Sequence, residues 1–384
     1  MEFELTEEQK MFSKMAREFA ERELIPLDEK LDRTGEYPFD LYKKMAPLGL
    51  LGVLIPQEYG GLGQGVLTWV IINEQLAWGS LTATLITQNA MLPGSILNEA
   101  GNEEQKMRYL PPMCRGEKIY AVAAAEPEAG SDGGNINTMA AIEGDYWVIN
   151  GNKVFVTNGC VGDMVIALVQ TDKDKRGKGL ALIAIDKGTQ GMNSVPIKGM
   201  NGLRGDDIAQ IRFMDCRVAR KNLINEVGRG LRIAMGGINN MRIAISSYCV
   251  GVVQRCIDLC TKYAQSRIQF GKPIGSFQLV QNMIAEMEVN KEAAKLLTRR
   301  AAYNKDRGLP YIKEVSIAKL FSTQMAVEAT VKGIRIHGGY GGFEDYTIER
   351  LNRGVINVLA PGGTCEVHSM TIGRQLLGID ALSR

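Results

Sequence analysis

The hydrophobic pattern of this chain changes period twice, and this restricts the possible folds more than any other feature. Apolar residues recur at helical spacing early in the chain, as at Phe12, Met15 and Phe19, and the same spacing returns after about residue 228. Between these stretches lie short apolar runs separated by Gly, Asn and Asp, which are typical of strands. The helix, strand, helix order in 384 residues predicts an α+β protein of two or three domains.

Local signals place several helices in the first stretch. Thr6 followed by Gln9 predicts a capping box at a helix start. Pro26 predicts that this helical segment ends or kinks there. The glycine-rich residues 56–65 predict a loop, and residues 66–78 predict the next helix.

The middle stretch predicts a compact antiparallel β domain rather than βαβ units. Residues 146–157 contain Asn150 followed by Gly151, which predicts two strands joined by a tight turn. Other strand-length runs lie at residues 119–125, 164–170, 179–185 and 209–214.

The last stretch predicts long helices. Met283, Met287 and Ala294 follow helical spacing, as do Ile317 and Phe321, and we expect their methionine-rich faces to pack in the core. Residues 364–377 predict a final helix. The expected domains are an N-terminal helical domain (1–118), a middle antiparallel β domain (119–227) and a C-terminal helical domain (228–384).

Composition limits the partners. The 45 basic and 43 acidic residues give a net charge of +2, which predicts no nucleic-acid partner but allows local phosphate sites. The acidic start has no apolar signal-peptide core, and no apolar run suggests a membrane span. Seven cysteines without a Cys-x-x-Cys pair predict reduced thiols in a cytoplasmic protein. Cys256 and Cys260 are expected to be small buried residues, so no metal site is predicted.

Four loops carry groups that could meet a ligand. Residues 126–132 end in a turn with Ser131, and Phe155 and Thr157 would share one strand face. Residues 266–275 contain Arg267 and Lys272, while residues 337–342 are glycine-rich and follow a helix. Each loop taken alone is also compatible with an ordinary turn. The last is not a Rossmann fingerprint, because no strand precedes it. The two histidines, His337 and His368, lack the framing residues of a catalytic triad.

Taken together and in this order, these segments resemble the acyl-CoA dehydrogenase family over nearly the whole chain. That resemblance implies an N-terminal helical domain, a middle β domain and a C-terminal four-helix domain. It also implies FAD as cofactor, a homo-oligomer (most often a tetramer) and electron transfer to an electron-transferring flavoprotein. The residues that carry it are 5–9, 58–61, 126–132, 156–159, 267–271, 338–341 and 363–364.

The resemblance also assigns cofactor contacts. The flavin would be bordered by Ser131, Phe155 and Thr157, with Phe155 where a tryptophan is frequent. Ala125 stands where the family commonly has a flavin-facing Thr or Ser. Two further segments would reach the FAD of a neighbouring subunit: Arg267, Gln269 and Phe270 form the first, and Arg335 (usually Gln), Gly338 and Gly339 form the second. Thr364 and Glu366 would lie near the diphosphate and adenine.

The substrate side departs from the family pattern. Ser131 and Arg242 match positions near the CoA moiety, and Gly362 and Gly363 lie at the expected thioester site. Most relatives have a glutamate base where this chain has Gly362, and a smaller set has one where this chain has Met241. Neither residue can accept a proton, so the catalytic base is unknown. Arg353 is followed by Gly354, where Arg-Asp is usual. The candidate bases are Asp206, Asp207, Glu344, Asp345 and His368.

The sequence therefore predicts an FAD-dependent oxidoreductase acting on an acyl-CoA or carrier-bound acyl thioester. The reaction would be α,β-dehydrogenation or the reverse enoyl reduction, with an atypical or relocated base. One alternative is a desulfinase-like elimination, although the pocket arginine of such relatives is not evident in residues 83–89. Another is a protein that binds FAD or acyl-CoA without turnover. Residues 85–97 contain no Asp or Glu, so an aspartate base on that stretch is not supported.

Overall fold

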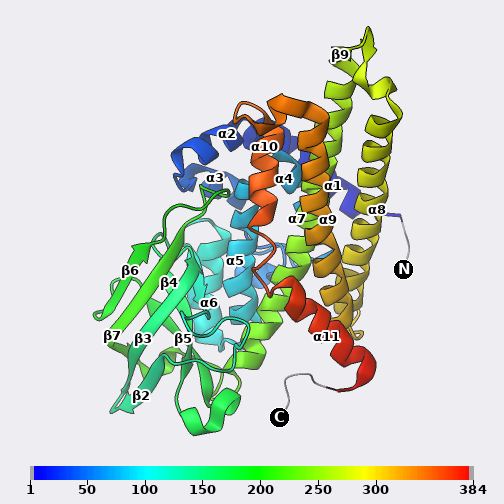
Figure 1. The fold of residues 1–384 in the computed structure, drawn as a ribbon. Coiled ribbons are helices and arrows are strands. Elements are labelled where there is room, and N and C mark those ends of the chain that lie inside the picture. The colour runs from blue at the N-terminus through cyan, green and yellow to red at the C-terminus, as the bar shows by residue number, and fades with distance from the viewer. Residues whose placement is uncertain (1–3, 380–384) are drawn as a thin grey trace.

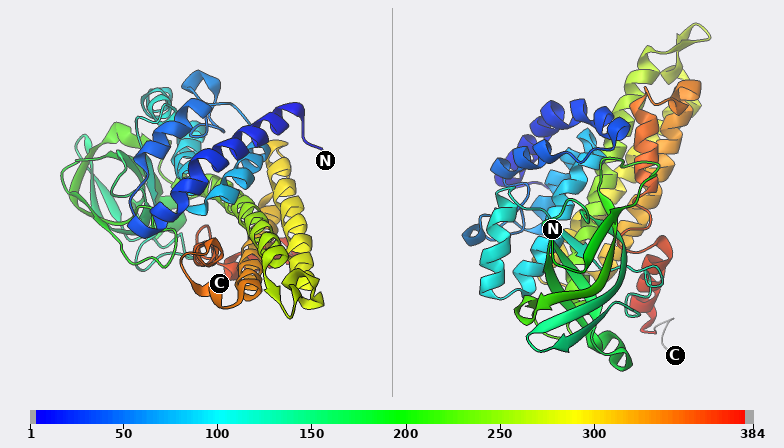
Figure 2. Two further views of the ribbon diagram at one scale, coloured as in Figure 1. Left: turned by 90° about the horizontal axis from the view of Figure 1, so that it is seen from above. Right: turned by 90° about the vertical axis from the view of Figure 1, so that its left-hand side faces the viewer.

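The computed structural model describes residues 4–379 and consists of a β-sheet and two groups of helices (Figure 1). Figure 2 shows the N-terminal helices between the sheet on one side and the long C-terminal helices on the other. The predicted helix, strand, helix order is confirmed, whereas the exact domain bounds remain a prediction. The helices are α1 (Glu7–Phe19), α2 (Ile25–Thr34), α3 (Phe39–Met45), α4 (Val66–Gly79), α5 (Leu81–Ala100), α6 (Glu103–Cys114), α7 (Gly230–Ser266), α8 (Gln278–Asp306), α9 (Ile312–His337), α10 (Thr347–Ile356) and α11 (Cys365–Leu377).

Local chemistry explains where the first helices begin. The Thr6 side chain accepts a hydrogen bond from the Gln9 N–H, and the Gln9 side chain accepts one from Thr6 N–H, which confirms the capping box. A π-helical turn, Ala20–Leu24, separates α1 from α2. Pro26 lies in the first turn of α2, directly after the π-helical turn, and its missing N–H leaves a carbonyl of that turn without the helical donor it would otherwise have.

The sheet is mixed, with most pairs antiparallel. Its strands run in the order β6-β7-β3-β2-β4-β5-β8, and β1 pairs with β4 in parallel. The predicted strand runs are confirmed. The domain is not purely antiparallel, because β1 pairs with β4 in parallel. The strands are β1 (Tyr120–Ala123), β2 (Met139–Glu143), β3 (Tyr146–Thr157), β4 (Met164–Gln170), β5 (Leu180–Asp186), β6 (Met192–Pro196), β7 (Ile208–Ala219) and β8 (Leu223–Ile224).

The predicted Asn150-Gly151 hairpin is wrong. β3 runs unbroken through both residues, and β7 pairs with it on both sides of Gly151, with a register shift beside it. Gly151 has φ 150°, and a Cβ there would come within 2.5 Å of the Thr138 Oγ1. The glycine therefore allows a close approach to the neighbouring chain segment rather than a turn.

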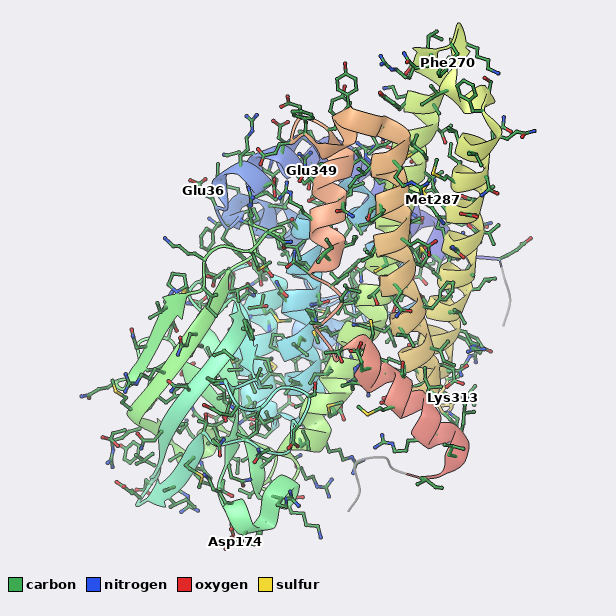
Figure 3. The ribbon with its side chains drawn as sticks, in the orientation of Figure 1. Glu36, Asp174, Phe270, Met287, Lys313 and Glu349 are labelled. Atoms are coloured by element: carbon green, nitrogen blue, oxygen red, sulfur yellow. The ribbon has the colours of Figure 1, made fainter. Side chains whose placement is uncertain are left out.

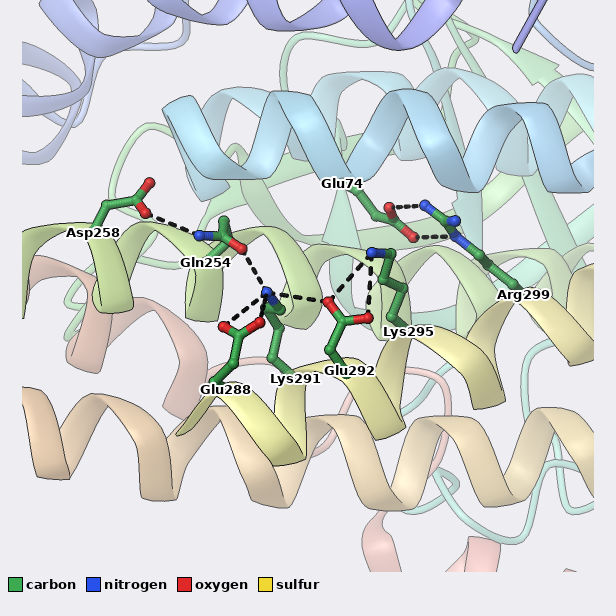
Figure 4. A network of polar contacts seen from close by, with 8 residues as sticks. All are labelled: Glu74, Gln254, Asp258, Glu288, Lys291, Glu292, Lys295 and Arg299. Atoms are coloured by element: carbon green, nitrogen blue, oxygen red, sulfur yellow. Dashed lines mark hydrogen bonds and ion pairs between the residues drawn. The ribbon is translucent and has the colours of Figure 1, made fainter. Parts of the chain in front are cut away.

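α7, α8 and α9 form the long C-terminal bundle, and α4 packs against it. α7 is long and apolar enough to cross a membrane, but 78% of its most apolar window is buried inside the fold, so core packing accounts for its composition. Polar contacts link these helices at one face (Figure 4). Arg299 of α8 pairs with Glu74 of α4, and Lys291 donates to Gln254 of α7 and pairs with Glu288.

A short hairpin, β9 (Ile268–Gln269) and β10 (Lys272–Pro273), joins α7 to α8. It projects from the end of the bundle and carries Phe270 at its tip (Figures 1 and 3). The Phe270 side chain is 92% exposed, which is unusual for a large apolar residue at an ordered turn. α11 lies at the opposite end of the bundle from this hairpin (Figure 1).

Candidate functional site

The structure brings the two expected base positions together. Gly362 has φ 74°, and a Cβ placed on it would lie 3.3 Å from the Met241 Cε and 3.2 Å from the Arg242 Cγ. Arg242 is buried, and its Nε donates to the Gly362 carbonyl oxygen at 2.5 Å. Positions 241 and 362, which are 121 residues apart in sequence, therefore border the same small volume.

Arg242 is held by neutral partners. Besides the Gly362 carbonyl, its Nη1 donates to the Asn239 Oδ1 at 2.9 Å, while its Nη2 points toward Gly363. Burial lowers the pKa of Arg242 to about 10, which still leaves it charged at neutral pH. Within residues 4–379, no carboxylate lies within ion-pair distance of this guanidinium, an arrangement that leaves a buried positive charge without a counter-ion.

A second buried cation lies beside it. Lys319 of α9 is fully buried, and its Nζ donates to the carbonyl oxygens of Leu359 and Gly363, at 2.5 and 2.8 Å. These bonds fix the loop that carries Gly362 and Gly363. Burial lowers the pKa of Lys319, and neither bonding partner is charged. Sequence reasoning missed Lys319, because its spacing on α9 gives no sign that it is turned toward this loop.

His368 completes the cluster. It is fully buried on α11, and its Nε2 lies 3.4 Å from the position of a Cβ on Gly363. Its ring lies near the backbone of Gly362 and Gly363, yet neither ring nitrogen makes a hydrogen bond of good geometry. Burial, followed by the charges of Arg242 and Lys319, lowers the pKa of His368 to about 3, so its imidazole is neutral.

The predicted flavin residues lie at the end of β3. Phe155 is 71% exposed and has φ 54°, a left-handed conformation that is rare for an aromatic residue. A bulge between Lys153 and Val156 interrupts the simple alternation expected there, but Phe155 and Thr157 both stay accessible while Val156 is buried. Ser131 is also exposed, and Ala125 is partly buried.

A buried ion pair fixes these two segments together. The Lys153 Nζ lies 2.8 Å from the Glu126 Oε1, and both side chains are almost fully buried. Glu126 also accepts hydrogen bonds from the N–H groups of Asn137 and Thr138. Burial lowers the pKa of Lys153 to about 8 despite this partner. Both residues belong to segments that the sequence analysis singled out, but the sequence gave no sign that they pair with each other.

The predicted inter-subunit segments gather at the far end of the bundle. The Arg267 guanidinium lies 5.7 Å from the Tyr340 ring centre, so the hairpin lies beside the glycine-rich turn after α9. Arg335, Gly338 and Gly339 are exposed, and a Cβ on either glycine would meet nothing within 4 Å. Within one chain the hairpin with Phe270 at its tip lies at the opposite end of the bundle from α11, the helix that follows Gly362 (Figures 1 and 3).

Thr364 and Glu366 lie at the start of α11. The Thr364 hydroxyl oxygen accepts a hydrogen bond from the Val367 N–H and caps the helix, while Glu366 is exposed in the first turn. The helix N-terminus carries partial positive charge, which suits a phosphate group. The two buried cations, from α7 and α9, thus meet the glycine pair that directly precedes the Thr364 cap.

The five candidate bases fall in different places. Glu344 and Asp345 precede α10, and Gly362 follows it. The ten residues of α10 span about 15 Å, so these two acids lie at the other end of that helix from Gly362. Asp207 accepts hydrogen bonds from the N–H groups of Cys160 and Val161, both at its Oδ2. His368 is neutral but a weak base, because its pKa is low.

Asp206 is the acid with the most suitable proton affinity. Burial, with the charge of Asp207, raises the pKa of Asp206 to about 7. Its Oδ1 accepts a hydrogen bond from Asn89 of α5 at 3.2 Å. It lies two residues before Ile208, which pairs with Thr157 at the end of β3. Asp206 therefore lies between α5 and the strand end that carries the predicted flavin contacts.

Comparisons with known proteins identify the family of the fold. The chain matches the acyl-CoA dehydrogenase N-terminal domain at residues 6–117, the middle domain at 121–216 and the C-terminal domain at 228–377. The chain belongs to the acyl-CoA dehydrogenase family, a class of flavoprotein oxidoreductases.

Three relatives illustrate the range of this similarity. The chain is 37% identical to the short-chain specific acyl-CoA dehydrogenase of Clostridium acetobutylicum, over 98% of this chain and 100% of that protein. It is 37% identical to a subunit of the caffeyl-CoA reductase-Etf complex of Acetobacterium woodii, over 97% and 99%. The structure of butyryl-CoA dehydrogenase from Megasphaera elsdenii superposes with a TM-score of 0.95 at 31% identity, over 98% and 100%.

Proposed function

We propose that this chain is an FAD-dependent oxidoreductase acting on an acyl-CoA or carrier-bound acyl thioester, with its catalytic base moved from the usual positions. The observation that carries this proposal is the backbone of Phe155 and Phe270. These are the two aromatic residues among seven non-glycine residues with positive φ in the described chain, and both are largely exposed. Strained residues of this kind gather at ligand sites, and both are predicted FAD contacts.

The residues present fit FAD. The Phe155 ring is largely exposed and Thr157 is partly exposed at the same strand end, and the N-terminus of α11 with Thr364 suits a diphosphate. Bound FAD supplies the hydride acceptor for dehydrogenation, or the donor for enoyl reduction. The chain's own task is to hold the thioester against the flavin and to move one proton at Cα.

Asp206 is the proposed proton acceptor. Its pKa of about 7 matches the requirement that a general base have a proton affinity near the working pH. It is held by Asn89 and approaches the strand end that bears Thr157. Neither Gly362 nor Met241 offers a proton acceptor, so the reaction needs a base elsewhere.

Oligomerisation and an electron-transferring flavoprotein partner belong to the same proposal. The Arg267 to Phe270 hairpin and the Gly338-Gly339 turn are exposed at one end of the bundle, where they would reach the FAD of a neighbouring copy. The outer face of α8 also exposes Leu279, Val289 and Leu296, as expected for a surface covered by another subunit. One relative, from Acetobacterium woodii, is named as a subunit of a caffeyl-CoA reductase-Etf complex, which supports such a partner.

A non-oxidative elimination is the second candidate. It is favoured by one observation: within residues 4–379 neither Arg242 nor Lys319 has a carboxylate partner, and neither of the usual base positions holds an acid. Such a cationic site suits a substrate group that leaves as an anion. A protein that binds FAD and thioester without turnover is the remaining alternative.

One set of assays tests all three. Purified protein should be yellow, release FAD on denaturation and bleach an electron-transferring flavoprotein or a dye when given a thioester panel. Elimination would instead release the β substituent without reducing the acceptor. Binding of thioesters with neither result would indicate a non-catalytic protein, and a colourless protein that does not bind added FAD would contradict the proposal.

A further inference from the structure

We infer that a cavity between α1, α4, α7 and α8 is a second ligand site, which binds a small carboxylate with a short apolar tail through Arg17 and Lys295. The residues that line this cavity belong to none of the segments predicted to meet FAD or the thioester. The site is therefore additional to the proposed function and does not depend on it.

The lining of the cavity is positively charged. Three cations line it, Arg17, Lys291 and Lys295, against one acid, Glu74. Both oxygen atoms of the Glu74 carboxylate already accept hydrogen bonds from Arg299, so they are not available to the other cations. Such a lining favours a ligand that carries an anionic oxygen group.

The two lysines of α8 share one carboxylate. Lys291 and Lys295 lie four residues apart and so occupy one face of the helix on successive turns (Figure 4). Lys291 pairs with Glu288 at 2.8 Å and with Glu292 at 3.1 Å. Within residues 4–379, Lys295 pairs with Glu292 alone, at 3.3 Å. Lys295 therefore keeps N–H donors for a ligand.

Arg17 is the cation without a direct partner. It lies half-buried in the last turn of α1, and its guanidinium carbon is 3.7 Å from the ring centre of Trp78 in α4. Within residues 4–379, Arg17 makes no ion pair or hydrogen bond: Asp258 and Glu21 attract it only from beyond that distance, and Arg255 repels it. Stacking on a ring leaves the N–H edge of a guanidinium available, and that edge suits a carboxylate bound through both oxygens.

The size of the cavity limits the ligand. Its volume of about 110 Å³ corresponds to about four water molecules, or to an organic anion of about six non-hydrogen atoms. Val250, which is almost fully buried, supplies an apolar wall. Butyrate matches this size, with its carboxylate at Arg17 and Lys295 and its tail at Val250, whereas a nucleotide or an intact CoA thioester is too large.

The expected subunit contact on α8 does not cover the cavity. That contact uses the outer face, where Val289 and Leu296 are exposed. At about 100° for each residue, Lys291 and Lys295 point about 130° away from these two around the helix axis, toward α4 and α7. A partner on the outer face therefore leaves the cavity accessible.

Binding of butyrate to the purified protein tests this inference. Calorimetric titrations at constant ionic strength would compare sodium butyrate with sodium phosphate and sodium chloride. We expect butyrate to saturate one site in each chain and to bind at least about tenfold more tightly than phosphate or chloride, because only butyrate joins a planar carboxylate to an apolar tail.

Tryptophan fluorescence gives a second measurement. Of the three tryptophans in the sequence, Trp69 and Trp147 are buried in the core, whereas Trp78 lines the cavity. Butyrate should therefore change the emission over the same concentration range as in calorimetry, and Trp78→Phe should remove this change.

Variants link the binding to this cavity. Arg17→Gln and Lys295→Gln should each weaken butyrate binding about tenfold or more, the loss expected when a hydrogen bond to a charged group is removed. Lys14→Gln removes the same charge at an exposed position of α1 and is the matched control, which should bind butyrate like wild type. The two cavity variants lie on different helices, so one still tests the inference if the other fails to fold.

The outcomes separate this inference from the proposed function. Absence of saturable butyrate binding would overturn the inference, as would equal binding by wild type and both cavity variants, which would place the anion elsewhere. Phosphate or chloride binding as tightly as butyrate would show an unspecific anion site and would also overturn it. Thioester turnover is measured separately, and its absence would contradict the proposed function while leaving butyrate binding unchanged.

Discussion

His368 should stay neutral far below the pH at which a histidine normally gains a proton. Burial and the nearby charges of Arg242 and Lys319 lower its pKa to about 3, against an ordinary 6.5. Charging the ring in the folded chain therefore costs about 5 kcal/mol more than in the unfolded chain, at about 1.4 kcal/mol for each tenfold change.

The sign of the effect on stability follows from linkage. Because the folded-state pKa is lower than the unfolded one, the unfolded chain binds the proton first as pH falls below 6.5. Stability due to this group is complete above that pH and decreases as pH falls toward 3. Between pH 6.5 and 5 the expected loss of the free energy of unfolding is about 2 kcal/mol.

The chain offers a direct assay, since it has only two histidines. In protein labelled with ¹³C at histidine Cε1, two signals should appear, and His337→Gln and His368→Gln variants would assign them. The His337 signal should titrate with a raised pKa: its burial opposes this, but Cys260 and the Gly333 carbonyl favour the charged ring. The His368 signal should not move between pH 8 and 5.

Urea unfolding at pH 7.5 and 5 gives an independent measurement. Wild type should lose about 2 kcal/mol more than His368→Gln over this interval, because only wild type carries the buried ring. A His368 signal that titrates near pH 6.5 would refute the described burial and charge of the cluster. An identical pH dependence of wild type and variant in urea would refute the linkage.

Three further predictions concern catalysis and stability. Met241→Glu should raise oxidation of butyryl-CoA in an acceptor-bleaching assay, and more than Gly362→Glu does, because position 362 has φ 74° and strains any side chain; a normal wild-type rate on butyryl-CoA would contradict this. If Asp206 is the base, turnover on the preferred thioester should rise with pH around a midpoint near 7, since only the ionised carboxylate accepts a proton, and Asp206→Asn should abolish turnover but not thioester binding. Lys153→Met should lower the free energy of unfolding by about 3–5 kcal/mol in urea, because it leaves the Glu126 carboxylate buried without its partner, whereas Lys175→Met at an exposed ion pair should change it little.

Local sequence signals predicted much of the fold correctly. The Thr6 capping box, the strand at residues 164–170 and the long C-terminal helices rest on hydrogen bonds and apolar spacing within one segment, which the sequence displays directly. The same reasoning was wrong at Asn150-Gly151. The dipeptide permits a turn, but pairing with β7 along both sides of it favours the extended strand.

In the candidate site, too, the sequence displays local features but not the contacts between distant segments. The sequence by itself determined the family and the absence of an acid at positions 241 and 362, and it predicted the segments that would meet FAD. It could not show that Arg242, Lys319 and His368 meet around Gly363, because they come from α7, α9 and α11. Nor could it show the buried Lys153–Glu126 pair or the raised pKa of Asp206. Burial and charge proximity depend on which helices and strands pack together, and only the tertiary structure decides that.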